Sequence, residues 1–115
     1  MAVLNLDKFY SGLDRLFEGY NPGEVQEYLE KNLAEADASG DIKGATAVLN
    51  ELSGLYRVQG RFSDAIEASN RSLYNLRQMG QKDTENYATA LINLADIYVA
   101  DKRYREALDM FKSSE

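Results

Sequence analysis

The chain has 115 residues, 44% of them hydrophobic and 28% charged, which suits one small soluble domain and leaves no room for two. Its 19 acidic and 13 basic residues give a net charge of −6, which repels phosphate backbones and argues against nucleic-acid binding. With no cysteine and no histidine, disulfides, thiolate metal sites, cysteine nucleophiles and the usual zinc and copper ligand sets are excluded.

Neither a secretory signal nor a membrane span is predicted. The start, "MAVLNLDKF", has no basic region followed by a long apolar core. No segment approaches the roughly 18 uninterrupted apolar residues that a spanning helix needs. We therefore expect a cytoplasmic protein that does not bind membranes.

Helical periodicity dominates the whole chain, whereas strand signals are weak. It predicts six helices, at about residues 4–18, 22–36, 42–58, 62–79, 85–100 and from 103 to the end. Asn21 can cap the second helix, and Pro22 suits its first position, where no amide hydrogen is needed. Gly80 can end the fourth helix in a left-handed cap, and Asp83 or Thr84 can cap the fifth. The short connections favour antiparallel neighbours packed as helical hairpins.

One pattern of side-chain sizes occurs twice, 42 positions apart. The order is large, large, small, aromatic, aromatic, small, and the later copy consists of Leu91, Leu94, Ala95, Tyr98, Tyr104 and Ala107. The earlier copy consists of Leu49, Leu52, Ser53, Tyr56, Phe62 and Ala65. A seventh position changes from Ser69 to Phe111. Small residues let a partner helix approach closely, and aromatic residues fill the space beside them. A single hairpin cannot bury both of its faces, so the next hairpin must stack on it.

The segments "LNELSGLYRVQGRFSDAIEAS" and "LINLADIYVADKRYREALDMF" resemble the tetratricopeptide repeat (TPR) family. Gly60 stands where that family usually has glycine, whereas Lys102 departs from it. The family's usual repeat is about 34 residues long, and the longer spacing here is similar to the variant in kinesin light chains and many bacterial proteins. The resemblance implies an all-α fold in which antiparallel helical hairpins stack as a right-handed superhelix.

The repeats suggest one domain over residues 1–115, with full repeats at 41–80 and 83–115. Residues 1–40 are interpreted as a degenerate or capping repeat, because Pro22 and Val25 occupy the aromatic and small positions. The last helix leaves an apolar face open at Tyr104, Ala107, Leu108 and Phe111. Either the chain is a fragment of a longer array, truncated within its last repeat, or another copy covers this face, most simply in a symmetric homodimer through the C-terminal hairpin.

No catalytic residues or cofactors are predicted. Acidic pairs such as Glu24 and Glu27 are ordinary surface charges, and "GDIKG" is not a phosphate-binding loop. The tyrosines of the repeat are accounted for by packing between helices. We therefore expect a protein that is not an enzyme.

The resemblance implies that the first helix of each repeat lines a concave face where a partner peptide lies. The corresponding positions are Asn50, Gly54, Arg57, Ile92, Asn93, Asp96 and Val99, joined by Tyr10, Asp14 and Phe17 from the degenerate repeat. An asparagine amide can hydrogen-bond both groups of a peptide backbone, and Arg57 can pair with a carboxylate. The alternative is that these are polar residues on an exposed face. The family's carboxylate clamp is not expected, because Gly54, Ile92 and Asp96 occupy lining positions.

These features together predict a protein–protein interaction scaffold that binds a partner peptide or protein. Two alternatives remain open at this point. One is a peptide-sensing regulatory domain of a larger protein, and the other is a helical domain that mediates only self-association.

Overall fold

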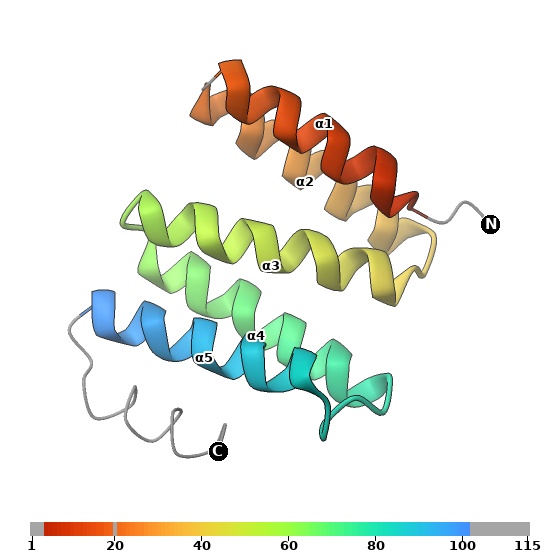
Figure 1. Ribbon diagram of the computed structural model, residues 1–115, viewed down its shortest axis with the longest axis vertical. Coiled ribbons are helices and arrows are strands. Elements are labelled where there is room, and N and C mark those ends of the chain that lie inside the picture. Colours follow the sequence, from red (N-terminus) through yellow and green to blue (C-terminus); the bar gives the residue numbers. More distant parts are fainter. Residues whose placement is uncertain (1–3, 20, 102–115) are drawn as a thin grey trace.

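The computed structural model describes residues 4–19 and 21–101, which form five helices. They are α1 (Leu6–Gly19), α2 (Pro22–Ala38), α3 (Ile42–Val58), α4 (Phe62–Gln78) and α5 (Glu85–Ala100) (Figure 1). No strand occurs in these two ranges, so the all-α prediction is confirmed, and the predicted helix ends lie within two residues of the observed ones. The predicted sixth helix, from residue 103, lies outside the described residues.

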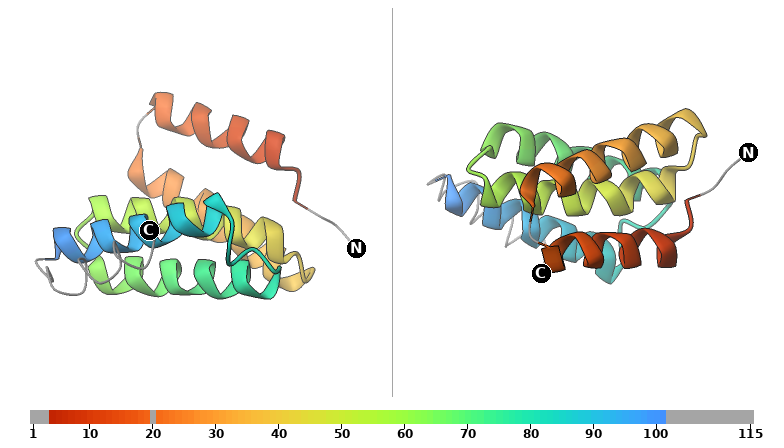
Figure 2. Two further views of the ribbon diagram at one scale, coloured as in Figure 1. Left: turned by 60° about the horizontal axis from the view of Figure 1, so that its bottom comes forward. Right: turned by 90° about the horizontal axis from the view of Figure 1, so that it is seen from above.

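The helices run antiparallel and pack against their neighbours in chain order (Figure 1). The α3–α4 hairpin has the most extensive packing, and α2 and α5 lie against α3 and α4 respectively. The odd-numbered helices lie on one side of the stack and α2 and α4 on the other (Figure 2). Because α3 also contacts α5 directly, the first helices of successive hairpins form a common surface.

Local sequence signals set the helix ends. The side chain of Asn21 accepts hydrogen bonds from the backbone N–H groups of Gly23 and Glu24, at 3.1 and 3.2 Å, as predicted for a cap. Thr84, rather than Asp83, caps α5. Three glycines have φ between 70° and 77° and follow α2, α3 and α4, namely Gly40, Gly60 and Gly80. Each is flanked by the two backbone hydrogen bonds of a Schellman motif, so the left-handed cap predicted at Gly80 occurs at all three helix ends.

The small residues of the repeat are buried where the helices cross. Ala65 and Ala95 have no solvent exposure and Ser53 is 4% exposed. Ala107 lies outside the described residues. At the turn between α3 and α4, the Arg61 guanidinium lies 4.4 Å from the centre of the Tyr56 ring and forms a cation–π contact. Small side chains therefore permit the close approach of α3 and α4.

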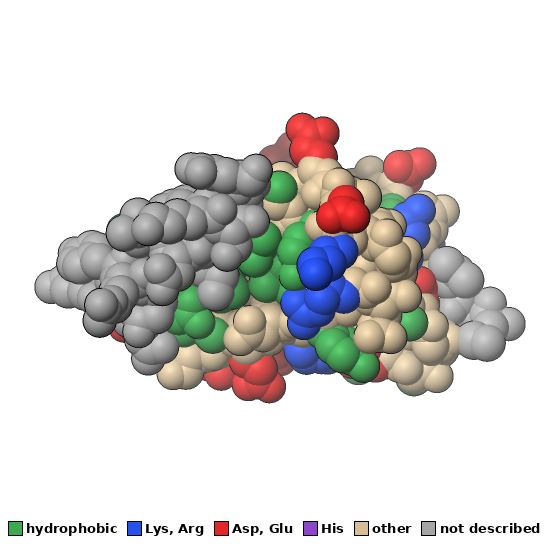
Figure 3. Space-filling model, turned by 90° about the horizontal axis from the view of Figure 1, so that it is seen from below, with side chains coloured by type: hydrophobic (Ala, Val, Ile, Leu, Met, Phe, Trp, Pro, Cys, Tyr) green, Lys and Arg blue, Asp and Glu red, His purple; other side chains and the backbone are tan. Residues whose placement is uncertain are grey.

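Two clusters of buried side chains form the core. The first joins α1, α2 and α3 and consists of Phe9, Leu13, Val25, Leu29, Val48 and Leu52. The second joins α4 and α5 and consists of Leu73, Leu76, Ala90 and Leu94. Figure 3 shows hydrophobic side chains gathered near the middle of one face of the molecule, next to Lys and Arg side chains. The open face predicted for the last helix, and the homodimer predicted through it, lie outside the described residues.

Candidate functional site

The first helices of the two main hairpins bring five of the ten predicted binding residues together. A cavity of about 200 Å³ between α3 and α5 is lined by Asn50, Gly54, Arg57, Asn93 and Asp96, with Ser53 and Ile97. The helical spacing of these residues explains the arrangement, because residues three and four positions apart project from the same face of a helix. The structure thus places these five residues around one cavity between α3 and α5.

A second cavity, of about 270 Å³, adjoins the first, because Asn50 and Asn93 line both. It extends the surface toward α1, whose Tyr10 contributes to the lining. The other lining residues are Leu6, Lys43, Thr46, Ala47, Leu76, Met79, Gln81, Asn86, Thr89 and Ala90. We call these two adjoining cavities the α3–α5 groove.

The remaining predicted residues do not line the groove. Ile92 and Val99 are each 40% exposed on α5, and Asp14 is exposed on α1. The side chain of Phe17 lies outside the described part of the structure. The roles predicted for these four residues in binding stay predictions.

Asn50 has a partner that the sequence did not reveal. Its amide oxygen accepts a hydrogen bond of 2.6 Å from the hydroxyl of Ser72, which is fully buried on α4. Within residues 4–19 and 21–101, the Asn50 amide NH₂ group and the whole Asn93 amide have no hydrogen-bond partner. Asn93 can therefore use both its donor and its acceptor for a ligand, whereas Asn50 has mainly its donor available.

The groove has charged groups of both signs. Arg57 and Asp96 are exposed, and neither forms an ion pair with another residue that the structure describes. Nearby, between α1 and α3, burial raises the pKa of Glu51, and the charge of Asp14 raises it further. Burial also raises the pKa of Tyr10, with a smaller contribution from the Glu51 charge. Glu51 and Asp14 thus lie beside the groove, whereas the charged residues that line it are Arg57, Asp96 and Lys43.

Sequence reasoning missed groove residues that periodicity could have indicated. Asn86 and Thr89 precede Asn93 by seven and four positions, so they share its face of α5. Lys43 and Thr46 precede Asn50 in the same way on α3. The contribution of α4 through Ser72 has no such signal, because it depends on how two helices pack.

Stacked antiparallel hairpins with small residues buried at their crossings define a helical-repeat protein. The tetratricopeptide repeat family model matches residues 44–115, which is more than half of the chain, and the chain belongs to that family. TPR repeats generally mediate protein–protein interaction, and the family is typically a non-enzymatic scaffold. No curated protein matches the chain.

No helix within residues 4–19 and 21–101 is both long enough and apolar enough to cross a membrane. Across the same ranges, no three histidine, cysteine, aspartate or glutamate side chains are grouped so that they could hold a metal ion.

Proposed function

We propose that this TPR protein binds an extended segment of a partner protein in the α3–α5 groove. The observation that carries the proposal is the position of Asn50 and Asn93, which line both cavities of the groove from two successive hairpins. Two amides with free hydrogen-bonding groups can hold a peptide backbone at two points along its length. These two contacts would not depend on the partner's side chains.

Arg57 would favour an acidic residue at one end of the bound partner segment. Its guanidinium, which pairs with no acidic residue in the described part of the chain, can form a charge-assisted hydrogen bond with a carboxylate of the partner. At the other end, Tyr10 and Leu6 offer an apolar contact next to Met79. We therefore expect bound segments to contain an acidic residue near Arg57 and an apolar residue near Tyr10.

The test begins with selection of peptides from a random library displayed on phage, followed by fluorescence anisotropy of the selected peptides. Asn93→Ala removes hydrogen bonds to the peptide without disturbing another side chain, and we expect binding to weaken about two- to tenfold, the equivalent of roughly 0.5–1.5 kcal/mol. Asn70→Ala is the matched control, because Asn70 is an exposed asparagine on α4 outside the groove. Equal binding by the Asn93→Ala variant and the wild type would show that the peptide lies elsewhere.

The same experiment separates the predicted alternatives. A peptide-sensing regulatory domain would select one tight, sequence-specific peptide. A self-association domain would select none and would form dimers in light scattering. The division into a capping repeat at 1–40 and repeats at 41–80 and 83–115, and the cytoplasmic location, also stay proposals.

A further inference from the structure

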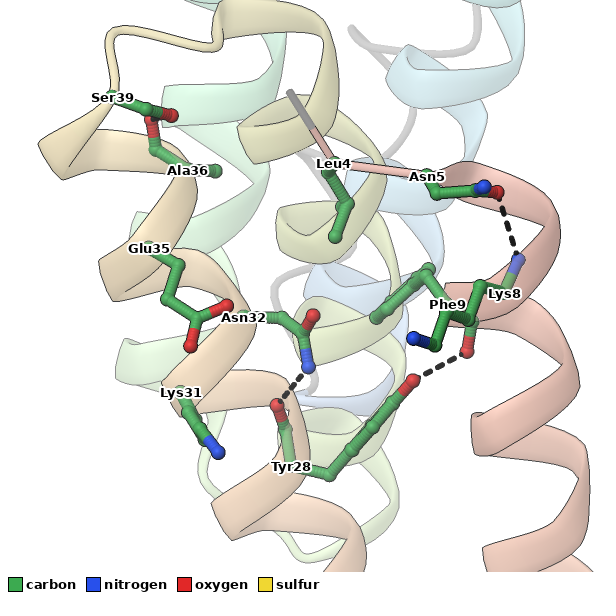
Figure 4. Close-up of a pocket in the computed structure, with 10 residues that line it drawn as sticks. All are labelled: Leu4, Asn5, Lys8, Phe9, Tyr28, Lys31, Asn32, Glu35, Ala36 and Ser39. Carbon is green, nitrogen blue, oxygen red and sulfur yellow. Dashed lines mark hydrogen bonds between the residues drawn. The ribbon is translucent and has the colours of Figure 1, made fainter. Parts of the chain in front are cut away.

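A cavity of about 430 Å³ lies between α1 and α2 in the first hairpin (Figure 4). It is lined by Leu4, Asn5, Lys8, Phe9, Tyr28, Lys31, Asn32, Glu35, Ala36 and Ser39. It shares no residue with the α3–α5 groove, so it does not belong to the proposed peptide site. Its volume lies within the range of about 300–1,000 Å³ that is typical of small-molecule sites.

The cavity exists because the first hairpin is closed at only one end. Leu13 and Val25 pack together near the α1–α2 connection, whereas the end of α2 presents the short side chains of Ala36 and Ser39 toward α1. The start of α1 is held by another element, since the Leu4 N–H donates a 2.9 Å hydrogen bond to the Asp41 carboxylate. This bond anchors α1 at the beginning of α3, and α1 packs less extensively against α2 than α3 does against α4.

Aromatic rings form an ordered apolar wall in the cavity. The rings of Phe9 and Tyr28 stack with their centres 5.7 Å apart and their planes 6° apart. The Tyr28 hydroxyl donates a 2.8 Å hydrogen bond to the Phe9 carbonyl, which fixes the position of the ring (Figure 4). Leu4 and the Tyr28 ring are partly exposed and offer a preformed surface for an apolar group, while the buried Phe9 ring supports Tyr28 through the stack.

Two cations line the same cavity from opposite helices. Lys8 extends from α1 and Lys31 belongs to α2 (Figure 4). Neither forms an ion pair with any residue in the described ranges, although the chain as a whole is acidic. Glu35 is the one acidic residue in the lining, so the charge of the cavity is net positive by one unit.

We propose that this cavity binds a small amphipathic monocarboxylate. Its apolar body lies against Leu4 and Tyr28, and its carboxylate lies between the ammonium groups of Lys8 and Lys31. The single excess positive charge favours a monoanion over a dianion, because a second negative charge would lie near Glu35. A ligand in this position fills the open end of the hairpin and holds α1 against α2.

The test uses the full chain labelled with ¹⁵N and three probes that share one skeleton. They are 3-phenylpropionate, its neutral amide 3-phenylpropionamide, and the cationic 3-phenylpropylamine. We expect 3-phenylpropionate to give saturable amide shifts confined to α1, α2 and the start of α3, with a dissociation constant on the order of 1 mM or lower. The amide should bind at least about threefold more weakly and the amine more weakly still, because each removes the attraction to the lysines.

Variants then locate the charge. Lys8→Met and Lys31→Met should each weaken 3-phenylpropionate binding about threefold, and the double variant about tenfold. Lys82→Met removes one exposed lysine from the α4–α5 connection and should leave binding unchanged. The proposal is overturned if the amine binds as well as the carboxylate, if the shifts lie outside this hairpin, or if no probe binds. The comparison of probes needs only the wild-type chain, so it stands even if a variant fails to fold.

Discussion

The α3–α4 and α1–α2 hairpins solve the same packing problem with different residues. In α3–α4, small side chains such as Ser53, Ala65 and Ser69 are buried at the crossing, and the two helices pack extensively. In α1–α2, Val25 replaces the small residue, and close approach occurs where Gly12 meets the Tyr28 ring. The first hairpin remains open at one end and contains a cavity of about 430 Å³. The buried small residues therefore account for the closer packing of α3 and α4.

The largest expected effect comes from enlarging Ala65, the small residue buried in the α3–α4 hairpin. Ala65→Leu inserts three carbon atoms where Ala65 has no solvent exposure, which should force α3 and α4 apart. We expect the free energy of unfolding to fall by about 3 kcal/mol, measured by urea denaturation. Ala34→Leu on the exposed face of α2 is the matched control and should change it by less than about 0.5 kcal/mol. Similar changes in the free energy of unfolding for both variants would mean that the small size of Ala65 does not determine how α3 and α4 pack.

The corresponding test in the open hairpin uses glycine. A Cβ atom at Gly12 would collide with the Tyr28 hydroxyl, whereas one at Gly54 would meet nothing within 4 Å. Gly54→Ala should raise the free energy of unfolding by about 1 kcal/mol through helix propensity. Gly12→Ala gains the same propensity, but Tyr28 must move and lose its hydrogen bond to Phe9, at a cost of about 1 kcal/mol, so we expect almost no net change. An equal gain from both substitutions, in parallel thermal or urea unfolding, would contradict the contact between Gly12 and Tyr28.

A third effect separates the two asparagines of the groove. Asn50→Ala leaves the buried Ser72 hydroxyl without its partner and should lower the free energy of unfolding by about 1–2 kcal/mol. Asn93→Ala removes no hydrogen bond within the described residues and should cost less than about 0.5 kcal/mol. Adding Ser72→Ala to Asn50→Ala should recover part of the loss, as a double-mutant cycle by urea denaturation would measure. If the second substitution adds its own full cost, the 2.6 Å hydrogen bond does not stabilise the fold.

These residues show which features the sequence could predict. Periodicity and the side-chain pattern were sufficient for the helices and for the burial of Ala65 and Ala95, because both depend on local spacing. Asn50 and Asn93 line the same cavity because they occupy neighbouring positions on the first helices of two stacked hairpins.

The hydrogen bond from Ser72 to Asn50 and the α1–α2 cavity could not be predicted in this way. Both depend on the separation between helices, and this separation is set by how many side chains of different volume pack together. The tether from Leu4 to Asp41 spans 37 positions of the sequence and has no periodic signal. The sequence therefore indicates which face of a helix is buried, but it does not indicate where a cavity remains between two packed helices.

The smallest expected effect concerns the side of α1 that faces α3. Burial and the Asp14 charge raise the pKa of Glu51 in the folded state, so the folded chain holds this proton more tightly than the unfolded chain does. Ionised Glu51 therefore destabilises the fold at neutral pH, and this cost disappears as the pH falls through the raised pKa and below the usual value near 4.5. Glu51→Gln should raise the free energy of unfolding at pH 7 by up to about 0.5 kcal/mol, since the site is partly exposed to solvent.

Urea denaturation at pH 7 and pH 4 would measure this change, with Glu67→Gln on the exposed face of α4 as the control. The difference between the Glu51→Gln variant and the wild type should shrink at pH 4, and Asp14→Asn should reduce it at pH 7 by removing the neighbouring charge. A Glu51→Gln variant that is less stable than the wild type at pH 7, with the deficit shrinking at pH 4, would mean that Glu51 stabilises the fold as a carboxylate. In that case the Glu51 charge would help to hold α1 against α3. We infer instead that Leu4, Phe9 and Leu13 hold α1 in place and that the charge opposes them.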